Sequence, residues 1–441
     1  MADRPQQPVL GLILFGGSLS GALVRDVRLA NELVGRGYTV HAWWVMDQPK
    51  ASPLDDRVHE HLLFHGFRYY RRPRWLFEQV GRAMRWYWSD HKRARSLQKR
   101  PQVGERIMQQ YMRRVAAGGT GDRAVLDRFV RQVREAGVTH LLPMLSMFGM
   151  YALAAGDRLG DVRQLITFQG YELYVNYART AGVEQQVYAT LRAAAEASPW
   201  PAIAVSEDYA QRVTDELGVR RDRLVAIPPG VPAHRRIDRA AAEATLAKRL
   251  KKYDPDLPLV SYLGRQDVEK GIDLLLYAAR QLQREGRRFQ LAICGPTLFS
   301  ERYCAVIRQL ARDLRLRVIF QRHVDDALRD ALLGGSRCVV YPSIHREPFG
   351  MVAAEAASFA TPAVVPDYGG VAEAISAEGR DAGLRFAVWD SGDLARQIAR
   401  LLDDDTLWQR LSDAGPHVAA YYAIERMADR VLAHLGHDPR P

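Results

Sequence analysis

The chain has 441 residues, of which 47% are hydrophobic and 26% charged, and a net charge of +11. This length suits two globular domains, and the composition excludes disordered and fibrous classes. The cysteines Cys294, Cys304 and Cys338 match neither a metal-site spacing nor a disulfide framework, which favours a reducing cytoplasm. Residues 1–7 are polar and lack the apolar core of a signal peptide, and no apolar stretch reaches the length of a membrane span.

The excess positive charge is concentrated in residues 66–119. This segment holds fourteen Lys and Arg against three acidic residues, which accounts for the whole net charge of +11. Tryptophans lie among the basic residues at Trp75, Trp86 and Trp88. That pattern is typical of amphipathic helices at an anionic membrane surface. The alternatives are a packed helical insertion with solvated arginines and a nucleic-acid site, but no nucleic-acid-binding module is recognisable. We expect an anionic membrane surface as partner and no nucleic acid.

The first half of the chain alternates between strand and helix patterns. It opens with the apolar run Val9–Phe15, typical of a buried parallel strand, then a glycine-rich turn at 16–21 and a helical pattern over 22–36. The turn has the spacing of neither a P-loop nor a dinucleotide fingerprint. Further strands are expected at residues 38–45, 138–143, 164–172 (running into a polar loop), 202–206 and 224–231.

The alternation restarts after a charged linker at residues 232–257, which is predicted to carry a helix. Strands are expected at residues 259–265, 289–295, 318–320, 338–341 and 362–365. The chain is therefore predicted to be α/β, with two doubly wound halves. In such folds ligands bind at the carboxyl ends of the strands, so we expect a site in a cleft between the halves.

The most informative stretch runs from Glu347 to Glu355. An Ala-rich helix is predicted from Met351, so its N-terminus lies near Gly350, where unpaired N–H groups suit a phosphate. A carboxylate on each side of an anion site can bind sugar hydroxyls on either side of a diphosphate, as in a nucleotide-sugar pocket. The alternative is a solvated loop glutamate and a helix glutamate stabilised by the dipole.

Two basic residues follow the carboxyl end of one strand in the second half. Arg265 follows the strand that ends at Gly264, and Lys270 precedes the next helix. Each by itself is typical of a surface charge. Together with Glu347 and Glu355 they predict a diphosphate site.

This set of motifs resembles the retaining glycosyltransferases of family 4, which have the GT-B fold. The resemblance covers most of the second half and the general order of the first. It rests on Gly264-Arg265, Glu269-Lys270-Gly271, Glu347-Pro348-Phe349-Gly350 with Glu355 at the Glu-x7-Glu spacing, Pro366 with Gly369-Gly370, and more weakly on Val205-Ser206 and Ile227-Pro228-Pro229-Gly230-Val231.

The resemblance implies roles for the site residues. Arg265 and Lys270 hold the donor diphosphate and stabilise the leaving group, Glu347 contacts the donor sugar, and these three form the catalytic set. No metal is implied, because cationic side chains and the helix end bind the diphosphate, and no cofactor is implied, because the nucleotide sugar, a UDP- or GDP-sugar, is itself a substrate. The implied donor-binding residues are Gly17, Gly264, Phe349, Gly350, Met351, Val352 and Glu355, with the ribose assigned to Glu355.

The loop at residues 167–172 departs from the family pattern. Relatives often have a histidine there, whereas this chain has Gln169, which cannot act as a general base. In a front-side displacement the leaving phosphate takes the acceptor proton instead. Gln169 and Glu172 are therefore assigned to acceptor binding and orientation.

The resemblance also implies a domain plan and an activity. Residues 1–232 form an acceptor-binding Rossmann-like domain with the insertion 66–119, residues 233–410 bind the donor, and a helix at about 411–435 packs back on the first domain. The expected enzyme is a hexosyltransferase acting on a lipid-linked or envelope glycan precursor, in the cytoplasm or peripheral to the inner membrane face. A soluble acceptor and a sugar-nucleotide epimerase on the same fold are the alternatives.

Overall fold

The computed structural model describes residues 7–15, 20–46, 48–49, 51–65, 112–113, 123–143, 156–170, 172–233, 237–297 and 301–436. The chain divides into two compact units. Unit 1 comprises Met1–Ala204, Ala210–Ala226 and Val431–Pro441, and unit 2 comprises Val205–Tyr209 and Ile227–Arg430. The predicted membrane segment 66–119 lies outside the described residues, apart from Met112 and Arg113.

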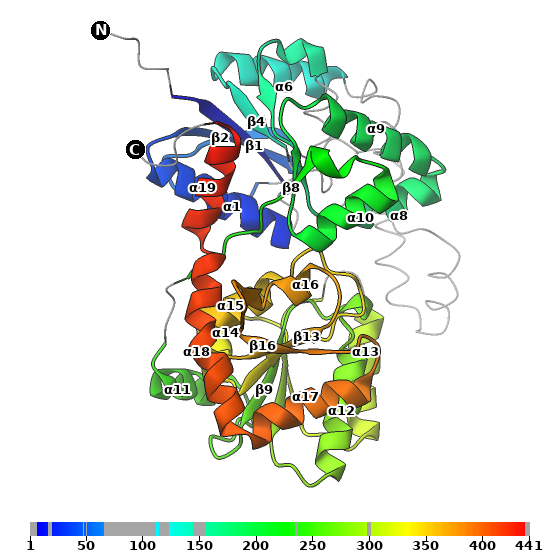
Figure 1. Cartoon of the computed structure of the whole chain (residues 1–441), viewed down its shortest axis with the longest axis vertical. Helices are drawn as coiled ribbons and strands as arrows, with labels where there is room; N and C mark the ends of the chain where they lie inside the picture. Colours follow the sequence, from blue (N-terminus) through cyan, green and yellow to red (C-terminus); the bar gives the residue numbers. More distant parts are fainter. Residues whose placement is uncertain are drawn as a thin grey trace, which may run out of the picture. The chain divides into compact units, whose positions relative to one another are not determined.

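Unit 1 contains two parallel sheets (Figure 1). Their strands are β1 (Val9–Phe15), β2 (Thr39–Met46), β3 (His59–His65), β4 (His140–Leu142), β5 (Arg163–Gln164), β6 (Thr167–Phe168), β7 (Ala202–Ala204) and β8 (Leu224–Ala226). The five-stranded sheet has the order β3-β2-β1-β4-β5, and the three-stranded sheet has the order β6-β7-β8. The predicted apolar strand β1 is central, with Leu10 and Leu12 fully buried.

The described helices between these parallel strands are α1 (Gly21–Gly35), α6 (Arg123–Glu135), α8 (Glu172–Ala181), α9 (Glu184–Ala197) and α10 (Glu207–Leu217), the last of which begins in unit 2. Ser20 caps α1 by accepting a hydrogen bond from the Leu23 N–H. The apolar stripe of α6 is buried at Val125, Phe129 and Val133, as its helical spacing predicts.

Two parts of unit 1 differ from the sequence-based prediction. Strand β3 was not predicted because its sequence, His-Glu-His-Leu-Leu-Phe-His, contains no long apolar run; it lies at the sheet edge beside β2. The single strand predicted at 164–172 was wrong, because β5 and β6 belong to different sheets. Glu172 lies at the start of α8 and not in a loop.

Unit 2 is built on a parallel six-stranded sheet with the order β11-β10-β9-β12-β13-β16. Its strands are β9 (Leu259–Leu263), β10 (Gln290–Cys294), β11 (Val318–Gln321), β12 (Cys338–Val340), β13 (Ala363–Pro366) and β16 (Gly383–Phe386); β14 (Ser376–Ala377) and β15 (Arg380–Asp381) form a separate antiparallel pair. All five residues of β9 and of β10 are buried, as expected for parallel strands covered on both faces.

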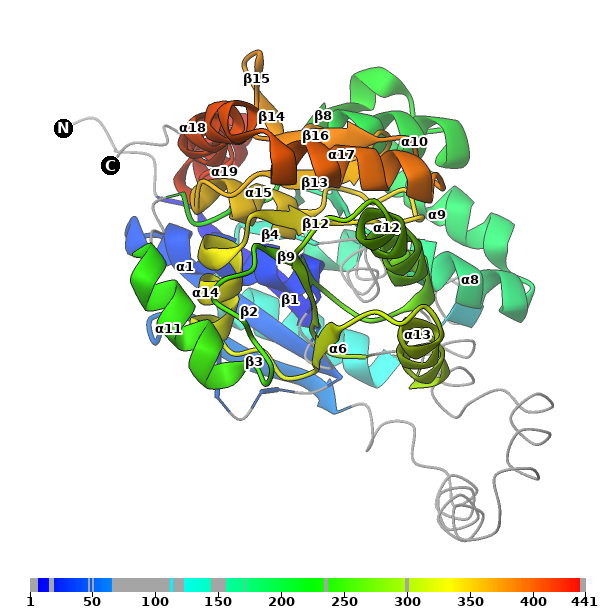
Figure 2. The same ribbon diagram turned by 90° about the horizontal axis from the view of Figure 1, so that it is seen from below.

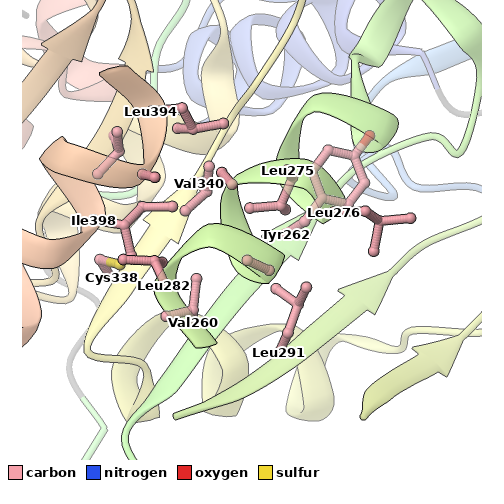
Figure 3. Packing of buried hydrophobic residues seen from close by; sticks show 14 of the residues in the cluster. Val260, Tyr262, Leu275, Leu276, Leu282, Leu291, Cys338, Val340, Leu394 and Ile398 are labelled. Carbon is pink, nitrogen blue, oxygen red and sulfur yellow. The ribbon is translucent and has the colours of Figure 1, made fainter. Parts of the chain in front are cut away.

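Helices cover both faces of this sheet. They are α11 (Arg239–Arg249), α12 (Ile272–Arg284), α13 (Glu301–Asp313), α14 (Asp326–Gly335), α15 (Met351–Ser358), α16 (Gly370–Glu373) and α17 (Ser391–Asp403). Figure 2 shows α11 and α14 on one side of the strands, with α12 and α13 on the other. The core on the second side joins Leu275 and Leu282 of α12 to Leu394 and Ile398 of α17 over the strands (Figure 3).

The helix predicted at about 411–435 is in fact two helices, α18 (Asp405–Tyr421) and α19 (Ile424–His434). The break at Tyr422 and Ala423 is stabilised by Val231, which follows β8 and precedes α11. The Val231 N–H donates to the Tyr422 carbonyl at 2.8 Å, and the Ile424 N–H donates to the Val231 carbonyl at 3.2 Å. This exchange supplies partners for backbone groups that a continuous helix would pair internally.

Among the described residues, none of the helices combines the length and the hydrophobicity that spanning a bilayer requires.

Candidate functional site

Strand β12 leads into the loop Tyr341–Gly350, here called the Glu347 loop, and α15 follows it. Gly350 has a φ of 85°, a left-handed conformation that favours glycine at the start of the helix. A Cβ at Gly350 would also lie 2.4 Å from Cγ2 of Val371. Because Gly350 has no capping side chain, the first N–H groups of α15 are available to bind an anion.

The turn that carries Lys270 packs directly against the Glu347 loop. Gly271, with a φ of 61°, permits this approach, since a Cβ there would lie 2.1 Å from the Pro342 carbonyl oxygen. The Glu269 carbonyl accepts a hydrogen bond from the Ile344 N–H at 3.1 Å, and its oxygen also lies 3.0 Å from the Ser343 hydroxyl oxygen. These contacts bring the carboxyl ends of β9 and β12 together, as the parallel sheet predicts.

Lys270 and Glu347 form a buried ion pair at this junction. Each is only 7% exposed, and Nζ of Lys270 donates a hydrogen bond to Oε1 of Glu347. Nζ also lies 3.3 Å from the Tyr341 hydroxyl, and the Ser343 hydroxyl donates to the same Oε1 at 2.7 Å. The structure therefore confirms that Lys270 is not a surface charge and that Glu347 is not a solvated loop residue.

The two partners keep each other charged. Burial lowers the pKa of Lys270, but the Glu347 carboxylate and the Tyr341 hydroxyl outweigh it and raise the pKa above its ordinary value. Burial raises the pKa of Glu347, but Lys270 and His345 outweigh it and hold the pKa below its usual range. Burial and the Glu347 charge raise the pKa of Tyr341 to about 12, so its hydroxyl stays neutral near pH 7. An ionised pair in so little water is suited to binding a polar, charged ligand.

Arg265 lies at the end of β9 and is held by two acidic residues. Its guanidinium contacts Oδ2 of Asp267 at 2.5 Å and Oε1 of Glu269 at 2.9 Å. Burial lowers the pKa of Arg265, but Glu269, Asp267 and Glu347 outweigh it and raise the pKa. Arg265, Lys270 and Glu347 thus form one electrostatically coupled group. An anion at this position competes with Glu269, whose side chain is more than a third exposed.

The remaining donor-site predictions fall around the same helix start. Phe349 is buried, and its ring packs edge-to-face on Tyr422 with centroids 5.1 Å apart, so its side chain is structural. Met351 and Val352 form the first turn of α15. Glu355 lies one turn further along α15 and is buried. Gly264, at the end of β9, donates its N–H to the Cys294 carbonyl. Of the predicted donor residues, Gly17 lies outside the described residues.

Two site residues were missed by the sequence analysis. The strand expected at 338–341 ends at Tyr341, and Ser343 carries no predicted role, yet both contact the Lys270–Glu347 pair. The available signal was their position at a strand end, six and four residues before Glu347. That position by itself does not show which way a side chain points.

The two residues predicted to bind the acceptor, Gln169 and Glu172, belong to unit 1. Gln169 follows β6 and is 7% exposed, and its Oε1 has no hydrogen-bond partner among the described residues. Burying an unpaired amide oxygen is costly, which is consistent with a position that awaits a hydroxyl donor. The Glu172 side chain is outside the described part of the structure. In the described ranges, no three His, Cys, Asp or Glu side chains converge as metal ligands.

The part of the chain that carries this site is similar in sequence to known proteins. Residues 245–418 match the family model described as glycosyl transferases group 1. The alpha-D-kanosaminyltransferase of Streptomyces kanamyceticus is 31% identical over 194 residues, which are 44% of this chain and 49% of that protein. The matches to the curated relatives span about half the length of each relative.

Two solved structures are similar over nearly the whole chain. The sucrose-phosphate synthase of Thermosynechococcus elongatus has a TM-score of 0.70 at 20% identity and covers 98% of both chains. An Anabaena protein crystallised with UDP and glucose has a TM-score of 0.69 at 14% identity, covering 98% of this chain and 100% of its own. At these identities the likeness concerns the fold. The chain therefore has the GT-B fold, and its residues 245–418 match the group 1 glycosyl transferase family.

Proposed function

We propose that this protein is a retaining glycosyltransferase of family 4, which moves a hexosyl group from a nucleotide-diphosphate sugar to an acceptor. The observation that carries the proposal is the buried Lys270–Glu347 pair beside the uncapped start of α15. A cation and free backbone N–H groups can bind a diphosphate, and a carboxylate beside them can bind the hydroxyls of the sugar linked to it. The group 1 domain supports the same conclusion.

Lys270 is the central residue of the proposed mechanism. An ammonium group has three N–H donors, and two of them are directed to Glu347 and Tyr341, which leaves one for a phosphate oxygen. Arg265 and the first N–H groups of α15 share the remaining phosphate charge. As the bond from the sugar to the diphosphate breaks, these groups stabilise the charge that develops on the leaving oxygen. No metal ion and no cofactor is needed in this scheme.

Glu347 and Glu355 hold the two sugars of the donor. We place the Glu347 carboxylate at the transferred sugar, because Lys270 and Ser343 fix the position of Oε1. Glu355, one turn inside α15, binds the ribose hydroxyls. The backbone of residues 349–352 is proposed to line the region between them, and the family resemblance assigns Gly17 and Gly264 to donor binding as well.

The acceptor is proposed to bind unit 1 at Gln169 and Glu172. Because Gln169 is not a base, the leaving phosphate takes the acceptor proton on the same face of the sugar, which gives retention. We propose a lipid-linked or envelope glycan precursor as acceptor, with the basic segment 66–119 on an anionic inner membrane face. A UDP- or GDP-sugar is the proposed donor. The Anabaena structure, which contains UDP and glucose, supports the former.

A donor panel tests the proposal. The protein is incubated with UDP-, GDP- and ADP-sugars, and released nucleotide and sugar are quantified, with the anomer of the initial product assigned by NMR. We expect one donor class to be cleaved with retained configuration, and Lys270→Met to lower the rate by about 10² to 10³. An epimerised nucleotide sugar would favour the epimerase alternative. Full activity of the Lys270→Met variant would contradict the diphosphate assignment.

A further inference from the structure

We propose that Ser206 and Asp208 are positioning residues for Glu347, although they lie about 140 positions before it in the chain. The inference rests on the proposed function, because it concerns the carboxylate assigned to the donor sugar. Both residues belong to the short segment Val205–Tyr209, which packs within unit 2. Neither contacts the Glu347 carboxylate; each holds a residue next to Glu347 in the chain.

The first contact fixes the residue after Glu347. The hydroxyl of Ser206 is fully buried and donates to the Pro348 carbonyl oxygen at 2.7 Å. The same oxygen of Ser206 accepts a hydrogen bond from the Tyr209 N–H at 3.0 Å, so Ser206 serves as the N-cap of α10. One hydroxyl therefore joins the start of α10 to the Glu347 loop.

The second contact fixes the residue before Glu347. The guanidinium of Arg346 binds Asp208 through two nitrogens, with Nη2 at 2.6 Å from Oδ1 and Nε at 3.0 Å from Oδ2. This is the two-pronged geometry that gives an arginine–carboxylate pair its orientation as well as its energy. Both side chains are partly buried, so the pair is less screened by solvent than an ordinary surface pair.

The short helix α16 completes the arrangement. Its Gly370 N–H donates to the carbonyl of Glu347 at 2.8 Å. From its other end, the Glu373 carboxylate accepts the N–H groups of Glu207 at 3.0 Å and Asp208 at 2.6 Å. Glu373 thereby caps the N-terminus of α10, and α16 binds both Glu347 and the segment that holds its neighbours.

These contacts leave the Glu347 backbone little freedom. Residues 346, 347 and 348 are each bound, by Asp208, Gly370 and Ser206 respectively. A shift of about 1 Å in a catalytic group can lower a rate by about 10², so such fixing matters for the reaction and not only for stability. The segment Val205–Tyr209 thus contributes to the geometry of the donor site within unit 2.

The test uses the full chain with the variants Asp208→Ala, Arg346→Ala and the double variant. We expect each single change to lower kcat by about 10- to 100-fold with the donor KM changed less than about 3-fold. The double variant should resemble the single ones, because all three break the same pair. Arg346→Lys keeps the charge but not the two-pronged geometry and should recover only part of the rate.

A matched control is available within unit 2. Arg287 and Asp403 form an ion pair of 2.8 Å between the end of α17 and the amino end of β10. Asp403→Ala should leave kcat unchanged. If Asp208→Ala also keeps the wild-type kcat while Glu347→Gln abolishes turnover, the positioning role is wrong and the proposed function stands.

Hydrogen exchange gives a readout that does not depend on activity. We expect the peptide containing residues 344–350 to exchange faster in Asp208→Ala than in the wild type, and unchanged in Asp403→Ala. Unchanged exchange in Asp208→Ala would overturn the inference. If the peptide exchanges faster in Asp208→Ala but the wild-type protein cleaves no nucleotide sugar, the positioning contact is supported and the proposed function is rejected.

Discussion

At the scale of single residues, the Lys270–Glu347 pair combines a structural and a chemical role. Its two charges are buried together, so removing one leaves the other without its main partner. The cost of an unpaired buried charge is about 3 to 5 kcal/mol, whereas replacing both charges is often nearly neutral. Stability and catalysis can therefore be separated by comparing single and double variants.

We expect Lys270→Met and Glu347→Gln each to lower the rate by about 10² or more, and Lys270→Met to lower the free energy of unfolding by about 3 kcal/mol. The double variant should regain most of the stability and none of the activity. Urea denaturation followed by circular dichroism measures the first quantity, and donor turnover the second. Recovery of activity in the double variant would show that neither charge takes part in the reaction.

At the scale of elements, the start of α15 depends on Gly350 for two separate reasons. Its φ of 85° is unfavourable for a residue with a Cβ, and a Cβ would also clash with Val371. Gly286, which follows α12, has almost the same φ of 83° but has nothing within 4 Å of the position of a Cβ. The two glycines therefore separate backbone strain from crowding.

We expect Gly286→Ala to destabilise the protein by about 1 kcal/mol, the cost of a left-handed conformation for a residue other than glycine. Gly350→Ala should cost more than this, because Val371 must also move, and should weaken donor binding by displacing the first N–H groups of α15. Thermal unfolding and donor titration measure the two effects. Equal destabilisation by both changes would contradict the crowding argument.

The pairing of β2 with β3 brings three histidines together. Nδ1 of His41 lies 2.9 Å from Nε2 of His61, and the rings of His41 and His59 stack 4.7 Å apart. Burial and the neighbouring histidines lower the pKa of His41 from 6.5 to about 4 and also lower that of His61. The folded protein therefore disfavours protonation of His41 and His61.

Because the unfolded chain protonates His41 near pH 6.5 and the folded chain only near pH 4, stability falls as the pH is lowered between these values. Below about pH 4 the loss should level off. We expect His41→Phe, which keeps the ring stacking, to show a smaller decrease in the urea midpoint over this range. His323→Gln, at an exposed histidine, is the control and should follow the wild type. Identical pH profiles for all three proteins would reject the assignment.

At the scale of the whole molecule, the positive charge is unevenly distributed along the chain. Residues 66–119 account for the net charge of +11, and the remaining sequence is close to neutral. Each basic residue near an anionic leaflet contributes about 1 kcal/mol to binding. A membrane acceptor and a basic segment would act together, since binding at the surface raises the local concentration of a lipid-linked substrate.

We expect the protein to sediment with vesicles containing anionic lipid and not with zwitterionic vesicles, and to be released by salt. Replacing Arg71, Arg72 and Arg74 by glutamine should weaken binding by about 10². Replacing the exposed Arg284, Arg288 and Arg302 of unit 2 removes the same charge elsewhere and should have little effect. Equal loss in both variants would indicate attraction by net charge alone, and no binding would favour a soluble acceptor.

Much of the architecture could be predicted because it is encoded locally. The apolar runs of β1 and β9, the stripe on α6 and the Ala-rich α15 each show their structure within a few consecutive residues. The charged site residues Arg265, Lys270 and Glu347 could be singled out for the same reason, since each stands at a predicted strand end. Strand β3 and the split between β5 and β6 were not predictable in this way, because their short and polar sequences owe their conformation to neighbouring strands.

The sequence by itself determined the α/β alternation, the position of the charged residues at the strand ends and the basic character of residues 66–119. Only the tertiary structure decided that Lys270 is buried against Glu347, that Tyr341 and Ser343 join them, and that Ser206 and Asp208 hold the residues on either side of Glu347. The physical reason is that periodicity reports the environment of a residue among its neighbours in the chain. A contact across 140 residues depends on how the parallel strands and their crossover helices pack, which no local pattern contains.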